Sequence, residues 1–131
     1  MKKRAKGLAG ILLAAAMLLT LPLTASAAWA NPFADVKPGA WYYNAVEYVN
    51  TEGLFSGTSE TTFSPESAMT RGMFVTVLGK FAQVDPSEYA AGSFTDVTSR
   101  DYYAPYVEWA AESGLVSGVG GGKFAPGNSI T

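Results

Sequence analysis

Apolar residues recur at the spacing i, i+3, i+4, i+7 in three stretches of the chain, at 41–52, at 71–83 and after residue 101. This period places the apolar side chains on one face of a helix, so each stretch predicts an amphipathic helix. The first helix presents Tyr42, Ala45, Val46 and Val49. The second presents Phe74, Val77, Leu78 and Phe81. The third presents Tyr103, Tyr106, Val107 and Ala110.

Local signals mark the ends of these helices. Gly53 and Gly114 follow the first and third helices, where a residue in the left-handed conformation commonly ends a helix. Thr70 is the expected N-cap of the second helix, and Asp101 is the expected cap of the third. Asp85-Pro86 is expected to stop the second helix, because proline disfavours helical geometry in the residue before it.

The chain repeats itself at an offset of 61 residues. Residues 33–70 align without a gap to residues 94–131, with 13 identities in 38 positions. Each repeat is predicted to be a helix, a loop and a helix, so the fold class is mainly α. Two short helices cannot enclose a core, and each repeat must bury its apolar stripe against neighbours. The second copy stops at Thr131, before its second helix, which suggests a longer protein.

The N-terminus predicts an export signal over residues 1–27. Four basic residues within the first six precede an apolar stretch at 8–23, and Ala25-Ser26-Ala27 offers a small-x-small cleavage site. A second cut after Ala30 and a retained membrane anchor are the alternatives, although the apolar stretch is short for a spanning helix. No cysteine follows the apolar stretch, so a lipid-anchored lipoprotein is excluded.

Composition removes several chemistries. The chain has no cysteine and no histidine, which excludes disulfides, Cys/His zinc sites and His-dependent catalytic triads. No Asp-x-Asp-x-Asp loop or phosphate-binding motif is present, so neither a metal nor a cofactor is predicted. After residue 27, five Lys and Arg face eleven Asp and Glu, a net charge of −6 that argues against nucleic acid as partner.

The motifs, in order and twice, resemble the S-layer homology (SLH) domain family. They read Phe33-x-Asp35-Val36, Trp41-Tyr42, Ala45-Val46, Gly53-Leu54, Ser56-Gly57, Phe63-x-Pro65 and Thr70-Arg71. The resemblance divides the chain into a short segment 28–32, repeat 1 at 33–84, a linker at 85–93 and a truncated repeat 2 at 94–131. It implies repeats in threes that form a pseudo-threefold helical bundle, completed by neighbouring repeats of the same or another chain.

The resemblance also implies a function. Grooves between SLH repeats hold bacterial cell-wall polysaccharide without a covalent bond, often a secondary cell wall polymer that ends in a pyruvylated amino sugar. The domain anchors S-layer proteins and surface enzymes to the wall, so we expect a secreted, non-enzymatic cell-surface anchor. Two alternatives stay open: a protein–protein packing module of a surface layer, and the anchor of an enzyme whose catalytic domain lies downstream.

The family's Thr-Arg-Ala-Glu binding motif reads Thr70-Arg71-Gly72-Met73 here, so the acidic residue is missing. Arg71 is the leading polysaccharide-binding candidate, with Thr70 beside it. A ligand carboxylate would accept hydrogen bonds from the guanidinium and from free N–H groups of the helix start. The alternative is a local salt bridge, for example to Glu66.

The other candidate residues each have a binding and a structural interpretation. Trp41 and Tyr102 occupy equivalent positions and either stack on sugar rings or pack between repeats. Asp35 and Asp96 either bind sugar hydroxyls or satisfy backbone N–H groups. Gly57 either lets a loop approach a ligand or supplies a positive φ. The mid-helix Glu47 and Glu108 are expected on a solvated face.

Overall fold

The computed structural model describes residues 28–130 and is mainly α, as the sequence predicts. The helices are α1 (Tyr43–Thr51), α2 (Arg71–Phe81), a short 3-10 turn η1 (Pro86–Glu88) and α3 (Ala104–Glu112). The predicted export signal, residues 1–27, lies outside the described residues. Within residues 28–130, none of the helices has the length and apolar character needed to cross a membrane.

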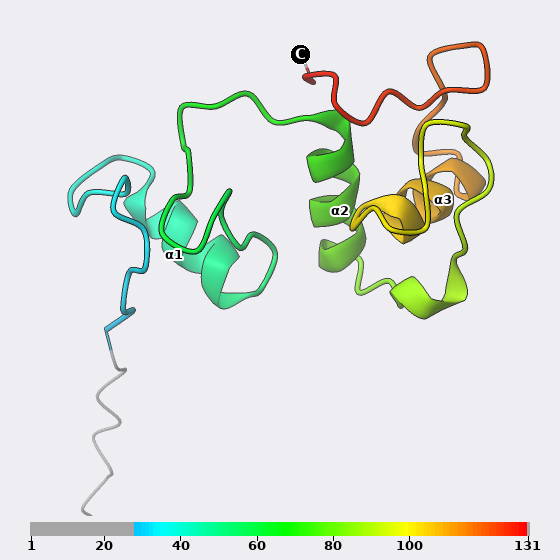
Figure 1. Cartoon of the computed structure of the whole chain (residues 1–131). Coiled ribbons are helices and arrows are strands. Elements are labelled where there is room, and N and C mark those ends of the chain that lie inside the picture. The colour runs from blue at the N-terminus through cyan, green and yellow to red at the C-terminus, as the bar shows by residue number, and fades with distance from the viewer. Residues whose placement is uncertain (1–27, 131) are drawn as a thin grey trace, which may run out of the picture.

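The helices form two units, which we call the first unit (residues 28–69, with α1) and the second unit (residues 70–130, with α2, η1 and α3). Helix α2 packs against α3, whereas α1 packs against none of the other described helices (Figure 1). The second unit has a core of Val75, Val97, Ala104, Val107, Ala110 and Phe124. The first unit has a smaller core of Phe33, Val36 and Val46. Helix α2, which the sequence analysis assigns to repeat 1, therefore packs with repeat 2.

The face that α2 buries differs from the predicted one. The predicted stripe includes Phe74 and Phe81, which are 41% and 67% exposed. The buried residues are instead Gly72, Val75, Thr76 and Gly79. A Cβ atom on either glycine would meet a tyrosine ring of repeat 2, at 2.9 Å from Tyr103 and at 2.3 Å from Tyr106. The apolar period correctly predicted a helix but not its buried face. The rings of Tyr103 and Tyr106 pack on the side of α2 that carries Gly72 and Gly79.

The predicted helix ends are confirmed at the glycines and wrong at Asp101. Gly53 and Gly114 both adopt φ +68°, the left-handed conformation that ends α1 and α3. The residue before α3 is Tyr103, which forms no side-chain cap. The Asp101 carboxylate instead accepts hydrogen bonds from the amide and the hydroxyl of Thr98, at 2.7 and 3.0 Å. It closes the preceding turn and leaves the helix start uncapped.

Glu108 does not lie on a solvated face, so that expectation is wrong. Its side chain is 3% exposed, and its carboxylate accepts hydrogen bonds from the amides of Gly92 and Ser93 and from the Ser93 hydroxyl. Burial raises the pKa of Glu108, but these hydrogen bonds outweigh it and hold the pKa below its ordinary value of 4.5. The equivalent Glu47 is partly exposed. Pro32 occupies the position equivalent to Ser93 and has no amide hydrogen to donate.

Candidate functional site

Asp35 and Asp96 fasten the same loop in the two repeats. The Asp35 carboxylate accepts hydrogen bonds from the amides of Phe63 and Ser64, at 2.9 and 2.7 Å. The Asp96 carboxylate accepts them from the amides of Phe124 and Ala125, both at 2.8 Å. All three positions of each set are related by the offset of 61. Both oxygens of each carboxylate therefore accept hydrogen bonds from backbone amides 28 and 29 residues later in the chain. These contacts agree with the structural interpretation, in which the aspartates satisfy backbone N–H groups.

These carboxylates should make the protein sensitive to acid. Amide hydrogen bonds, first from Phe63 and from Phe124, hold the pKa values of Asp35 and Asp96 below the ordinary value of 3.8. A lowered folded-state pKa contributes stability that is present above 3.8 and is lost as the pH falls through the folded-state pKa.

We therefore expect the melting temperature to fall as the solution is acidified below pH 3.8, and the fall to be shallower in an Asp35→Asn, Asp96→Asn double variant. The measurement is thermal unfolding followed by circular dichroism between neutral and acidic pH. Glu108 still titrates in the variant, so a residual slope is expected. An acid-induced fall of equal steepness in the wild type and the double variant would contradict this role.

Arg71 connects α2 to the loop of repeat 2. Its Nε donates a hydrogen bond to the carbonyl of Phe124 at 2.9 Å, and a terminal nitrogen donates to the carbonyl of Ser117 at 2.8 Å. The guanidinium carbon lies 4.4 Å from the centroid of the Phe124 ring, a cation–π geometry. The acceptors are main-chain carbonyls of the second repeat, so the predicted local salt bridge to Glu66 is wrong.

The start of α2 is also occupied. The amides of Arg71 and Gly72 donate to the carbonyls of Asn128 and Pro126, at 2.8 and 2.9 Å. The amide of Met73 donates to the Thr70 hydroxyl at 3.3 Å, which confirms Thr70 as the N-cap. In Figure 1 the C-terminal segment runs past this end of α2. The N–H groups at this end of α2 are therefore not free as the sequence analysis expected, because the protein itself satisfies them.

Gly57 supplies the positive φ of its structural interpretation and lets the loop approach the protein's own Phe33 ring. It adopts φ +83°, and a Cβ atom there would lie 2.6 Å from the Phe33 ring and 2.6 Å from the carbonyl of Thr62. Gly118, its equivalent, meets Phe94 in the same way at 2.8 Å, although its φ is not positive. The glycine is thus needed where the loop closes over the first aromatic ring of its own repeat.

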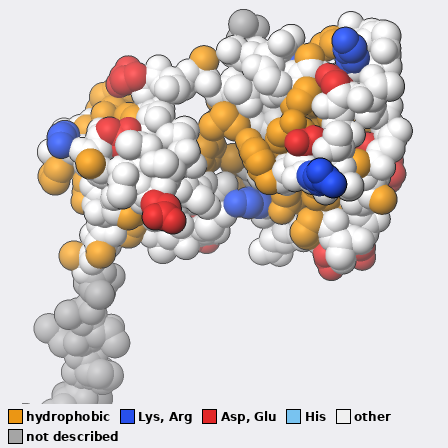
Figure 2. All heavy atoms as spheres, in the orientation of Figure 1, with side chains coloured by type: hydrophobic (Ala, Val, Ile, Leu, Met, Phe, Trp, Pro, Cys, Tyr) orange, Lys and Arg blue, Asp and Glu red, His pale blue; other side chains and the backbone are white. Residues whose placement is uncertain are grey.

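A cavity of about 440 Å³ lies between the first unit and α2. Its walls are the loop at 54–58, one side of α2 and a single aromatic side chain of repeat 2, Tyr102. Figure 2 shows the recess between the two units, with hydrophobic side chains gathered along its edge. The volume is within the range of about 300–1,000 Å³ that is usual for ligand sites. The lining residues are Leu54, Phe55, Ser56, Gly57, Thr58, Met73, Thr76, Val77, Lys80 and Tyr102.

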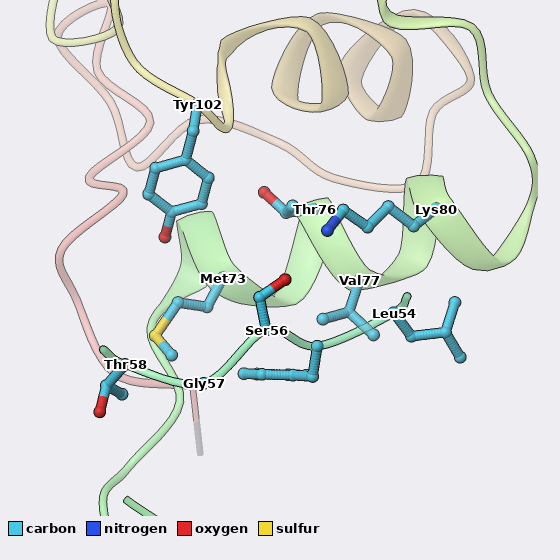
Figure 3. A pocket seen from close by; sticks show the side chains of 10 residues that line it. Leu54, Ser56, Gly57, Thr58, Met73, Thr76, Val77, Lys80 and Tyr102 are labelled. Carbon is cyan, nitrogen blue, oxygen red and sulfur yellow. The ribbon is translucent and has the colours of Figure 1, made fainter. Parts of the chain in front are cut away.

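The chemistry of this cavity is amphipathic. Tyr102 is 62% exposed and stands edge-on to Tyr103, with ring centroids 5.0 Å apart. Partial burial raises the pKa of Tyr102, so its phenol stays neutral and can donate a hydrogen bond at physiological pH. In the close view the Ser56 hydroxyl and the Lys80 amine point into the same space (Figure 3). Aromatic faces together with hydroxyl and amine groups suit a ligand that is itself both apolar-faced and polar.

Trp41 does not line this cavity, although it is equivalent to Tyr102. Its side chain is 92% exposed, so the described chain does not bury it as a packing residue. It stands edge-on to Tyr42 at 5.4 Å, which repeats the geometry of the Tyr102–Tyr103 pair. A second, more apolar cavity of about 380 Å³ lies between Trp41 with the apolar face of α1 and the α2 residues Met73 and Val77. Two equivalent aromatic residues therefore stand at two different cavities.

The candidate residues thus fall into separate groups. Gly57 and Tyr102 meet at the first cavity, and Trp41 lies at the second. Arg71 and Asp96 converge on Phe124, whose carbonyl accepts from Arg71 and whose amide donates to Asp96. The Thr70 hydroxyl instead accepts from the Met73 amide within α2. The sequence analysis missed Lys80, which lines the first cavity from the last turn of α2. A lysine in the last turn of a helix is so common that its position carries no sign of a site.

Residues 32–72 and 93–131 match the model of the S-layer homology domain, which is more than half of the chain. The chain belongs to the S-layer homology domain family. The two matched segments cover the motifs of both copies, which confirms the resemblance drawn from them. Within the described residues no group of three acidic side chains is placed to hold a metal ion.

Relatives carry this SLH segment within much longer proteins. The surface-layer 125 kDa protein of Lysinibacillus sphaericus is 32% identical over 108 residues, which cover 79% of this chain and 9% of the relative. The endoglucanase of Bacillus sp. strain KSM-635 is 30% identical over 102 residues, 78% of this chain and 10% of the enzyme. Endo-1,4-beta-xylanase A of Thermoanaerobacterium saccharolyticum is 30% identical over 99 residues, 76% of this chain and 8% of the enzyme.

Proposed function

We propose that this chain is a non-catalytic module that anchors an exported protein to the bacterial cell surface. The observation that carries the proposal is the presence of two SLH repeats in a segment shared by a surface-layer protein and by two polysaccharide-degrading enzymes with different names. A segment common to proteins with unlike activities supplies a shared property such as location, not the chemistry of any one of them.

The ligand in this proposal is a cell-wall polysaccharide, bound in the cavity between the first unit and α2. Sugars present apolar faces and hydroxyl edges, and Tyr102, Ser56 and Lys80 offer the matching aromatic face, hydroxyl and amine. Trp41 supplies a second exposed aromatic face at the neighbouring cavity. Within this proposal the finer assignment is a secondary cell wall polymer with a pyruvylated, and therefore anionic, sugar.

Sedimentation with purified cell-wall sacculi tests the proposal. Wild-type protein is expected to sediment with untreated sacculi and to stay in solution when acid extraction has removed the secondary polymer. Tyr102→Ala should weaken binding, because it removes an exposed aromatic face of the cavity. Tyr48→Ala is the matched control, since Tyr48 is 57% exposed and lines neither cavity. Equal sedimentation with both kinds of sacculi would rule out the polymer as ligand.

A second function, packing against further SLH repeats, is favoured by the exposed apolar surface. Phe81 on α2 is 67% exposed, and the α1 face at Trp41 and Tyr42 borders an open apolar cavity. In the second unit the equivalent face of α3 is covered by α2, so α1 lacks the cover that its counterpart has. Repeats of the same or another chain would complete the pseudo-threefold bundle by covering these faces. Oligomers that form with rising concentration and ignore the polymer would support this function over the first.

A further inference from the structure

Five backbone groups of the second unit hold the start of α2. Two carbonyls accept hydrogen bonds from the Arg71 side chain, at 2.8 and 2.9 Å. Two more accept from the amides of Arg71 and Gly72, at 2.8 and 2.9 Å, and one amide donates to the Met69 carbonyl at 2.9 Å. These five groups are the carbonyls of Ser117, Phe124, Asn128 and Pro126 and the amide of Ile130. The second unit thus recognises a helix start together with an arginine side chain.

The first unit has the same five groups and no helix bound to them. Within residues 28–130, none of these five groups forms a hydrogen bond. Four of the residues that carry them line the second cavity, beside the apolar face of α1. At the offset of 61, the groups are the carbonyls of Ser56, Phe63, Ser67 and Pro65 and the amide of Met69. A row of acceptors beside an open apolar face is what a helix start with an arginine would satisfy.

The backbone of the first unit already has the shape that binds a helix in the second. The Ser67 amide donates to the Ser64 carbonyl at 3.0 Å, as the Asn128 amide donates to the Ala125 carbonyl at 3.1 Å. Ser64 and Ala125 share a positive φ, +61° and +57°. The aspartate of each repeat fastens this loop with the same pair of amide hydrogen bonds. The acceptors are therefore positioned before any partner arrives.

Two positions on the first helix of each unit set the size of the side chains that a partner helix can carry. A Cβ atom at Gly72 would lie 2.9 Å from the Tyr103 ring, and the equivalent residue of the first unit is again a tyrosine, Tyr42. A Cβ atom at Gly79 would lie 2.3 Å from the Tyr106 ring, but the equivalent residue is Ala45, which is exposed. The first unit therefore requires glycine at the second helix position and has room for a large residue at the ninth.

We propose that the first unit is a docking site for a helix of another SLH repeat that begins Thr-Arg-Gly and carries a large apolar residue at its ninth position. Its arginine donates to the carbonyls of Ser56 and Phe63, and its ninth side chain covers Ala45. A second copy of α2 is a poor occupant, because Gly79 would leave a gap over Ala45. The inference rests on the second proposed function, packing against further repeats, because it names the segment that packs.

Peptides test which helix the site prefers. A fluorescein-labelled peptide with the sequence of residues 69–83 is titrated with the full chain, and its anisotropy is compared with that of the same peptide carrying Gly79→Leu. The leucine peptide should bind about tenfold more tightly, because its side chain buries apolar surface over Ala45. It cannot replace α2 in the second unit, where Tyr106 occupies that space. Adding Arg71→Gln to the leucine peptide should weaken binding about tenfold, because two hydrogen bonds are lost.

A substitution in the protein should reverse the preference. Ala45→Tyr gives the first unit the ring that Tyr106 gives the second, so this variant should bind the glycine peptide more tightly than the leucine peptide. Asn44→Tyr is the matched control, since Asn44 is exposed on the same helix and lines neither cavity. It should keep the preference of the wild type. Circular dichroism verifies that both variants fold.

The outcomes separate the inference from the function on which it rests. Equal affinities of the wild type for the glycine and leucine peptides would overturn the inference while packing against other repeats stands. A folded Ala45→Tyr variant that still prefers the leucine peptide, or that binds neither peptide, would also overturn it. If the wild type bound none of the peptides at about 1 mM, the inference and the packing function would both be refuted.

Discussion

Replacing Phe124 by alanine should destabilise the second unit by about 3–5 kcal/mol. Phe124 is fully buried, and its ring packs against Phe94 with centroids 5.4 Å apart. The same ring lies under the Arg71 guanidinium, 4.4 Å away, so the substitution opens a cavity and removes a cation–π contact. Urea unfolding followed by circular dichroism gives the change in the free energy of unfolding.

The repeat provides the control for this substitution. Phe63 is the equivalent residue in repeat 1, and it packs against Phe33 at 5.3 Å but is only partly buried. We expect Phe63→Ala to cost less, about 1–2 kcal/mol, because less apolar surface is covered and no arginine lies over the ring. Equal costs for the two substitutions would contradict the view that α2 completes the core of repeat 2 alone.

Replacing Gly79 by valine should cost about 2–3 kcal/mol. A Cβ atom at this position would lie 2.3 Å from the Tyr106 ring, so either the ring or the helix must move. Valine is also a poorer helix former than alanine, because its branched side chain loses χ1 freedom. The measurement is again urea unfolding, and the expected result is a lower midpoint with an unchanged slope.

A rescue variant distinguishes a clash from a general loss of helix. In a Tyr106→Ala background the added side chain has room, so Gly79→Val should cost clearly less than it does alone. Gly127→Val is a second control, because nothing lies within 4 Å of a Cβ atom built at Gly127. Additive costs of Gly79→Val and Tyr106→Ala would show that the close approach does not determine how α2 packs.

Motif residues for which the sequence allowed either a binding or a structural role have structural contacts in the folded chain. Asp35 and Asp96 were predicted either to bind sugar or to satisfy backbone, and the structure places two amides on each carboxylate. Arg71 stands in the most discussed binding motif of the family, yet its hydrogen bonds go to Phe124 and Ser117. These motif residues therefore hold the loops and join the repeats. Other motif residues, Leu54, Ser56 and Gly57, line the first cavity.

Local patterns determined the helices and the repeat. The apolar period placed all three helices, Gly53 and Gly114 ended two of them, and the offset of 61 paired residues that prove equivalent in their contacts. The same motifs identified the family. These features depend on neighbours in sequence, or on a spacing that can be counted along the chain, so the sequence by itself determined them.

Tertiary structure alone decided which faces meet. The period of α2 did not show that Gly72 and Gly79 would be buried in place of Phe74, because glycine makes room for a ring that arrives from α3. It did not show that Glu108 would be buried, since the amides that stabilise its carboxylate belong to Gly92 and Ser93. Lys80 became a candidate only when Gly53, 27 residues earlier, lay beside it. Burial and charge pairing depend on partners that are distant in sequence, and packing of the whole chain brings those partners together.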